Sequence, residues 1–231
     1  MKKIGIIGGL SWVSTAEYYR LLNRITQEKL GGVNSARLSI ESVNRQEYVR
    51  HVIEEKDEFA AGEMIRCAAQ CLERAGADFI VISCNDVHRF VPRIEPDISI
   101  PILHIAEATA VAIRQANIHT VALLGVRKTM EENFYSEVLR HHGINTIIPN
   151  EDERTYIHDS IYEELVKNVF LDATRRKYIE IINELQSRGA EGVVLGCTEI
   201  PLLVRTGDIQ VKTFSTTEIH CGAAVKMALA Q

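Results

Sequence analysis

Several features that would assign a chain to a broad functional class are missing from this one. No apolar run in its 231 residues reaches the roughly 18–20 residues that a membrane-spanning helix needs. Basic residues are not in excess, since 26 Lys and Arg stand against 31 Asp and Glu, which argues against a nucleic-acid or anionic-membrane partner. No Pro/Gly/Ser-rich linker interrupts the chain. We therefore expect a cytoplasmic protein whose partner is a small molecule.

Cysteine is sparse and is not arranged for disulfides or zinc. Five cysteines in a chain of this length do not form a disulfide framework. There is no CxxC pair, and no His and Cys cluster has zinc-finger spacing, so no metal site is predicted. Cys67 and Cys71 lie four residues apart in a helical pattern, which is typical of packing residues.

Two of the cysteines end apolar runs that nearly repeat one another. Residues 75–86 read AGADFIVISCND, and residues 188–199 read RGAEGVVLGCTE. The ungapped alignment matches Cys84 with Cys197, and each is followed two residues later by a carboxylate, Asp86 or Glu199. A chain that builds the same strand twice can present two thiols to one substrate. A base on one face of a carbon and an acid on the other need that arrangement.

Short β-branched runs alternate with helical stretches along the whole chain, which predicts an α/β fold. We expect two similar lobes, 1–117 and 118–231, each a mainly parallel sheet flanked by helices, with the active site in the cleft between them. The closing helix can pack back on the first lobe. The predicted strands are 4–7, 36–43, 79–83, 101–105, 121–125, 145–148, 192–196 and 211–214, and the longer predicted helices are 14–30, 59–75, 129–142, 151–167, 172–188 and 217–229.

The carboxyl ends of the predicted strands carry the candidate chemistry. Ligands of open α/β sheets bind at that edge, and Gly8, Cys84, Gly125 and Cys197 all fall there. Backbone amides that follow a strand-end cysteine favour its thiolate. The IGIIGG turn lacks a full GxGxxG, so a dinucleotide site is disfavoured.

Several segments of the sequence resemble those of a known protein family. The chain resembles the cofactor-independent aspartate/glutamate racemases over essentially its full length, and it looks closest to a bacterial amino-acid racemase branch. The matching segments are IGIIGGLSWVST at 4–15, CNDVH at 84–88, ALLG at 122–125 with Thr129, IYEELVK at 161–167 and GCTEIP at 196–201.

The resemblance implies an isomerase that interconverts L- and D-aspartate or glutamate, without pyridoxal phosphate or metal. Cys84 and Cys197 would be the two acid/base catalysts, one removing the α-proton and the other reprotonating the opposite face. A homodimer is expected on the same ground. Implied substrate-binding residues are Asn85 and Thr198 through their amides, Thr15 and Thr129 as carboxylate ligands, and Glu199 as an orienting or ammonium-binding group. The alternative for Glu199 is a carboxylate that only favours a helix N-terminus.

A dicarboxylic substrate also needs a cation for its side chain. Arg45 and Lys167 match basic positions of aspartate-specific relatives, and Arg50 competes with Arg45. Of the histidines, His88 could tune the thiol or bond locally, whereas His104 and His220 read as structural.

Two residues depart from the family pattern. Relatives usually have threonine at the position of Asp86, which we count among the substrate-binding residues, and many have aspartate where this chain has Ser215. A carboxylate beside Cys84 would repel both a thiolate and an anionic substrate. Two alternatives therefore stay open. One is a related two-cysteine enzyme for another carboxylic acid (an isomerase, a decarboxylase or a hydantoin racemase), and the other is an amino-acid-binding protein with impaired catalysis.

Overall fold

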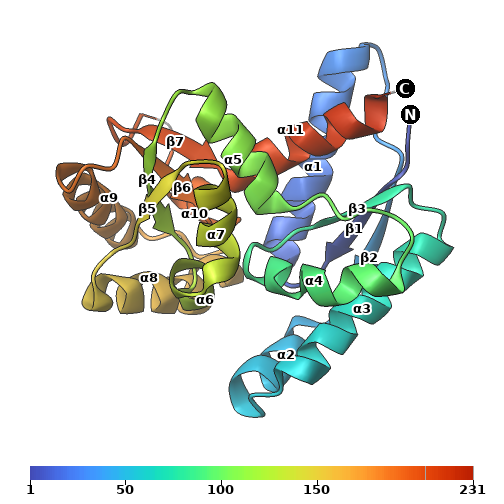
Figure 1. The fold of residues 1–231 in the computed structure, drawn as a ribbon, viewed down its shortest axis with the longest axis horizontal. Coiled ribbons are helices and arrows are strands. Elements are labelled where there is room, and N and C mark those ends of the chain that lie inside the picture. The colour runs from blue at the N-terminus through green and yellow to red at the C-terminus, as the bar shows by residue number, and fades with distance from the viewer. Residues whose placement is uncertain (206, 231) are drawn as a thin grey trace. The chain divides into compact units, whose positions relative to one another are not determined.

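The computed structural model describes residues 1–205 and 207–230, which form two compact units. Unit 1 comprises Met1–Ile105 and the closing segment from His220, and unit 2 comprises Ala106–Ile219. Figure 1 shows each unit as a sheet with helices packed against it. The predicted α/β class with two parallel sheets is confirmed.

Unit 1 is built on a three-stranded parallel sheet with strand order β2-β1-β3. In the register, Ile4 of β1 lies between Leu38 of β2 and Phe79 of β3. Strands β1 and β3 are fully buried and almost wholly apolar, as is typical of parallel sheets covered on both faces. The elements of this unit are β1 (Ile4–Gly8), α1 (Trp12–Leu30), β2 (Leu38–Ser42), α2 (Arg45–Val49), the π-helical segment η1 (Arg50–Glu54), α3 (Glu58–Arg74), β3 (Phe79–Ile82), the 3-10 turns η2 (Asp86–Phe90) and η3 (Glu95–Asp97), and α4 (Val91–Ile94).

Two apolar layers hold this sheet. Ile7, Ile80 and Ile82 pack toward α3 and α4 on one face. Ile4 and Val81 belong to the layer that contains buried residues of α1 and of the closing helix α11 (Thr216–Leu229). The closing helix contributes Cys221, Ala224 and Val225 to this layer.

Unit 2 has a four-stranded parallel sheet with strand order β5-β4-β6-β7. Its main core joins buried residues of β4 and β6 to α8, α9 and α10. The elements are α5 (Ile105–Gln115), β4 (Thr120–Leu124), α6 (Arg127–Glu131), α7 (Asn133–His141), β5 (Asn145–Ile147), α8 (Glu151–Glu163), η4 (Leu165–Lys167), α9 (Asp172–Ser187), β6 (Gly192–Leu195), α10 (Ile200–Leu203) and β7 (Lys212–Ser215).

Three details differ from the prediction for physical reasons. Residues 101–105 form a single bridge, Ile80 to Ile102, because Pro101 has no N–H to donate and α5 begins at Ile105. The predicted helix 129–142 is two helices, since Glu132 has extended backbone angles. α5 groups with unit 2, where Thr109 accepts a hydrogen bond from the Tyr135 hydroxyl at 3.2 Å, so the units divide near residue 105 rather than at 117.

Candidate active site

The turn after β1 is closed by contacts that only glycine permits. A Cβ on Gly8 would lie 2.5 Å from Cγ2 of Thr15. Gly9 has φ +83°, and a Cβ there would lie 2.1 Å from the carbonyl oxygen of Val43. The Thr15 hydroxyl donates to the carbonyl of Ser11 and accepts from the amide of Gly9, each at 2.9 Å. Thr15, predicted as a carboxylate ligand, therefore uses its proton to hold this turn.

Cys84 follows the buried strand β3 and is held from both sides. The Ser14 hydroxyl donates to the carbonyl of Ser83 at 2.8 Å, just before the cysteine. Ser11 is the N-cap residue of α1, so the Ser14 hydroxyl is available for this contact. The Cys84 thiol donates to Oδ1 of Asp86 at 2.9 Å. The carboxylate that departs from the family pattern is thus the hydrogen-bond acceptor of the thiol.

Asp86 has a cationic partner that sequence reasoning missed. Nη1 of Arg89 lies 2.7 Å from its Oδ2, and both side chains are buried. The i, i+3 spacing of Asp86 and Arg89 was visible in the sequence. It could not be told from an ordinary surface pair, because the sequence does not reveal that both side chains are buried.

His88 acts on Cys84 through the backbone. Its Nδ1 lies 2.9 Å from the carbonyl oxygen of Cys84, so Nδ1 carries the proton and donates it. Burial, with His104 and His220 as neighbours, holds the pKa of His88 well below its usual value. His88 was predicted either to tune the thiol or to form a local hydrogen bond, and the structure has the local hydrogen bond.

His220 joins the closing helix to the rest of unit 1. Its Nε2 donates to the carbonyl of Leu103 at 2.8 Å, and its Nδ1 accepts from the Tyr18 hydroxyl at 2.8 Å. Burial lowers the pKa of His220 to about 4. The ring is neutral near pH 7, in keeping with its predicted structural role.

The strand ends of unit 2 repeat the close approach seen in unit 1, with a different outcome for the threonine. A Cβ on Gly125 would lie 2.8 Å from the carbonyl oxygen of Gly196 and 3.0 Å from Cβ of Thr129. Thr129 is fully buried, and its hydroxyl has no hydrogen-bond partner. Because a buried hydroxyl is costly to leave unpaired, Thr129 is the better candidate for contact with a ligand.

Cys197 forms a thiol–carboxylate pair that mirrors the one at Cys84. Its thiol donates to Oε2 of Glu199 at 3.1 Å, and the Thr198 hydroxyl donates to the same oxygen at 2.8 Å. Glu199 is 1% exposed, and its other oxygen, Oε1, is buried without a partner. That oxygen can accept a hydrogen bond from a bound molecule.

Three unpartnered polar atoms follow three neighbouring strands of unit 2. Thr129 follows β4, Glu199 follows β6, and Thr217, whose buried hydroxyl also lacks a partner, follows β7. Sequence reasoning placed Thr217 only at the start of the closing helix. Its position just after the last strand was the available signal. Carboxyl ends of parallel strands share one edge, so these atoms mark that edge as a ligand site.

The predicted cations lie in different environments. Nη1 of Arg45 donates to the carbonyl of Leu10, in the turn after β1. Lys167 has a 57% exposed side chain and pairs with Glu163 at 2.7 Å. Arg50 is also exposed and pairs with Glu55 at 3.3 Å. Arg45 is thus the predicted cation that lies beside a strand-end turn.

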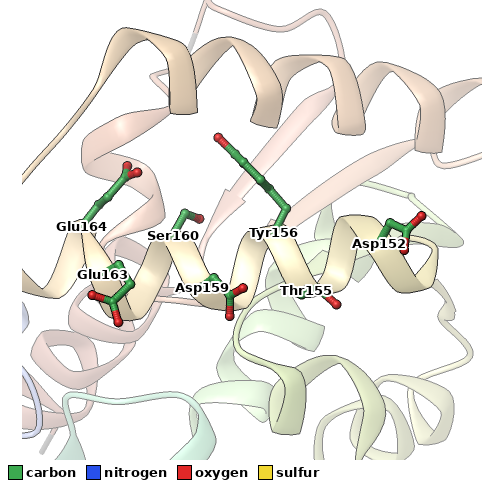
Figure 2. Close-up of a pocket in the computed structure, with 7 residues that line it drawn as sticks. All are labelled: Asp152, Thr155, Tyr156, Asp159, Ser160, Glu163 and Glu164. Carbon is green, nitrogen blue, oxygen red and sulfur yellow. The ribbon is translucent and has the colours of Figure 1, made fainter.

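A separate acidic hollow runs along α8 and contains none of the predicted site residues (Figure 2). Its carboxylates would repel an anionic substrate. The lining residues are Asp152, Thr155, Tyr156, Asp159, Ser160, Glu163 and Glu164.

Residues 1–205 and 207–230 contain neither a metal-binding cluster nor a membrane-spanning helix. No group of three or more His, Cys, Asp or Glu side chains is placed to hold a metal ion. None of the described helices combines the length and apolar character needed to cross a membrane.

The chain matches a known protein family over most of its length. The family described as Asp/Glu/Hydantoin racemase matches residues 7–224. The chain belongs to this family. Among its relatives with known structures, an Asp/Glu racemase candidate from Yersinia pestis is 41% identical over 100% of both chains, with a TM-score of 0.91. An aspartate racemase homologue from Pyrococcus horikoshii is 32% identical, again over 100% of both, with a TM-score of 0.86.

One curated member of the family resembles the chain more distantly. The broad specificity amino-acid racemase RacX of Bacillus subtilis is 25% identical over 200 residues, which is 85% of each protein. The predicted family is therefore confirmed.

Proposed function

We propose that the protein is an amino-acid racemase that interconverts enantiomers by proton transfer through Cys84 and Cys197, with aspartate or glutamate as first-choice substrate and without pyridoxal phosphate. The observation that carries the proposal is the duplicated thiol–carboxylate pair. Each unit ends a buried strand with a cysteine whose thiol donates to the carboxylate two residues on, at 2.9 Å in one unit and 3.1 Å in the other.

The chemistry needs two thiols in opposite protonation states. One thiolate takes the α-proton, and the electron pair of the broken C–H bond stays on the substrate, delocalised into its carboxylate. The other thiol gives its proton to the opposite face of the same carbon, so that one sulfur gains the proton that the other loses. The proposal therefore requires both cysteines to reach a single α-carbon.

The unpartnered atoms of unit 2 supply anchors for such a substrate. The hydroxyls of Thr129 and Thr217 can donate to the α-carboxylate, and Oε1 of Glu199 can accept from the α-ammonium group. The backbone amides of Asn85 and Thr198 remain the proposed donors to the carboxylate as charge develops on it. These anchors fit any α-amino acid, because they bind the groups that all amino acids share.

The side-chain preference is less constrained, and one observation favours a second candidate. Lys167 is solvent-exposed and engaged with Glu163, so Arg45 is the predicted cation better placed for a side-chain carboxylate. RacX, a relative, is named for broad specificity. A racemase for neutral amino acids is therefore the second candidate. A related reaction on another carboxylic acid, and binding without turnover, stay as outcomes of the test.

The deciding experiment is proton NMR of a panel of L- and D-amino acids incubated with the protein in D₂O without added cofactor. For at least one amino acid, we expect the Cα–H signal to disappear and the other enantiomer to form. Neither change should occur with Cys84→Ser or with Cys197→Ser. Cys67→Ser, a replacement at an exposed cysteine, is the matched control and should exchange as wild type does. Near wild-type exchange in either active-site variant would rule out the two-thiol mechanism.

A further inference from the structure

The carboxylate beside Cys84 is part of a chain of charged and polar groups buried in unit 1. Oδ1 of Asp86 accepts from the thiol at 2.9 Å. Oδ2 accepts from Nη1 of Arg89 at 2.7 Å and from the Tyr48 hydroxyl at 3.1 Å. The carboxylate of Asp86 thus lies between the thiol of Cys84 and the guanidinium of Arg89.

Arg89 is anchored firmly enough to keep this position. Its Nη1 also donates to the backbone carbonyl of Asp86 at 2.8 Å, and its Nη2 pairs with Glu58 at 2.9 Å. The Arg89 side chain is 7% exposed, whereas that of Glu58 is 43% exposed and more screened by water. Arg89 therefore interacts more strongly with Asp86 than with Glu58.

The ionisation states of the neighbours follow from their surroundings. Burial opposes the charge of Arg89, but Asp86, Tyr48 and Glu58 outweigh it and raise its pKa, so the guanidinium stays charged. Burial, reinforced by the charge of Asp86, holds the pKa of Tyr48 well above its usual value, so its hydroxyl remains a donor. His88 is neutral on the backbone side of Cys84.

A thiolate at Cys84 would face the carboxylate of Asp86 at hydrogen-bond distance, and like charges so close disfavour ionisation. The cation on the far side of that carboxylate offsets this repulsion. When the S–H bond breaks, the electron pair stays on sulfur and the proton passes to water, leaving two negative charges and one buried positive charge. Without Arg89, the same step would place two uncompensated negative charges side by side.

We propose that Arg89 is the counter-ion that lets Cys84 ionise beside Asp86, and thus a positioning residue whose charge offsets that of the carboxylate at the thiol. The pair would explain how this chain carries a carboxylate where relatives usually have threonine. Its consequence for catalysis rests on the proposed racemase function, whereas its effect on the thiol does not.

The thiol can be followed directly in the full-length protein. Iodoacetamide alkylates a thiolate by forming an S–C bond with loss of iodide, and mass spectrometry assigns the rate to Cys84. Asp86→Asn should move the midpoint of rate against pH down by about one unit, and Arg89→Met should move it up by about one unit. The double variant removes one charge of each sign and should lie between the two single variants.

Arg93→Met is the matched control, since Arg93 pairs with Glu63 at 2.8 Å in the same unit and is not part of the chain at Cys84. It should leave the Cys84 midpoint unchanged. Arg89→Met strands a buried carboxylate and could unfold the protein. Asp86→Asn and the double variant both lack this carboxylate, so the two can be compared without that risk. Loss of Arg89 should raise the pH midpoint of Cys84 alkylation in this background too.

Unchanged midpoints, or shifts of the same sign in both single variants, would overturn the inference. The alkylation experiment tests the role of Arg89, and the amino-acid exchange experiment tests the racemase proposal, so either can fail without the other. Opposite midpoint shifts in a protein that exchanges no amino acid would keep Arg89 as counter-ion and reject the racemase. Amino-acid exchange by the wild type without those midpoint shifts would keep the racemase proposal and reject Arg89 as the counter-ion.

Discussion

The thiol of Cys197 donates to Oε2 of Glu199 at 3.1 Å, while Oε1 of the same buried carboxylate has no partner. One oxygen is thus engaged with the thiol of Cys197 and the other is open to a donor. The pair at Cys84 differs, because both oxygens of Asp86 are engaged. Under the proposed function, the ammonium group of a bound amino acid would meet this vacant acceptor in unit 2.

The first prediction concerns Glu199. Glu199→Gln keeps the shape of the side chain and removes the charge that would hold the substrate ammonium. We expect kcat/KM for racemisation to fall about 10- to 100-fold, the range for losing a hydrogen bond to a charged group. Steady-state racemisation measured by circular dichroism tests this. Glu164→Gln, which alters a half-buried carboxylate bonded to Thr174 at 2.6 Å, should leave kcat/KM within about twofold, and an equal loss there would contradict the assignment.

The second prediction separates the two threonines. Thr129→Val removes a buried hydroxyl without a partner, so stability should hold or rise while kcat/KM falls about tenfold or more. Thr15→Val removes the bonds to Ser11 and Gly9 and should cost about 1–3 kcal/mol of unfolding free energy. Urea unfolding and racemisation assays on both variants form the test. A stability loss at Thr129 as large as that at Thr15 would show that Thr129 has an intramolecular role.

The third prediction concerns the turn after β1. Gly9→Ala would add a Cβ 2.1 Å from the Val43 carbonyl oxygen at φ +83°, so the turn must move, at a cost of about 3 kcal/mol or more. Gly76→Ala, just after α3, is the control, because φ is +75° but nothing lies within 4 Å of the added Cβ, and it should cost only about 1–2 kcal/mol. Thermal or urea unfolding measures both. Equal losses would mean that the backbone angle alone, and not the close approach, constrains Gly9.

The fourth prediction is a dependence of stability on pH. The pKa of His220 is about 4 in the folded protein, below the value of 6.5 for an exposed histidine. The unfolded chain therefore binds the proton first, so this contribution to stability is complete above about pH 6.5 and is lost as the pH falls toward 4. The loss is on the order of 3 kcal/mol.

Urea unfolding between pH 7.5 and 4.5 tests this dependence. His220→Gln should be less stable at pH 7.5 and should lose less stability on acidification than wild type. His141→Gln, at an exposed position, should retain the wild-type slope. A wild-type slope in His220→Gln would assign the acid sensitivity to other groups.

The parallel sheets could be predicted because their signal is local. Strands such as 79–82 and 192–195 are short, wholly apolar and bounded by glycine or polar residues, so their burial can be read from the sequence. The strand predicted at 101–105 failed because its apolar pattern does not reveal how few backbone bonds the segment can make.

The candidate site was predictable where the motif repeats and not where a contact depends on burial. The repeated Cys84 and Cys197 segments aligned without knowledge of the fold, and each cysteine does lie beside its own carboxylate. The pairing of Asp86 with Arg89 and the unpartnered hydroxyl of Thr217 needed the structure, because surface and core positions of these residue types look alike in a sequence.

The discontinuous make-up of unit 1 has a consequence for synthesis on the ribosome. Unit 2 is one continuous stretch, so all of it has been translated once Ile219 is added. Unit 1 begins first but lacks the closing segment until the end, and the bond between Tyr18 and His220 joins residues 202 positions apart. Domains generally fold as units during translation. Unit 1, which carries Cys84, is therefore completed after unit 2, although its strand β1 is translated before any residue of unit 2.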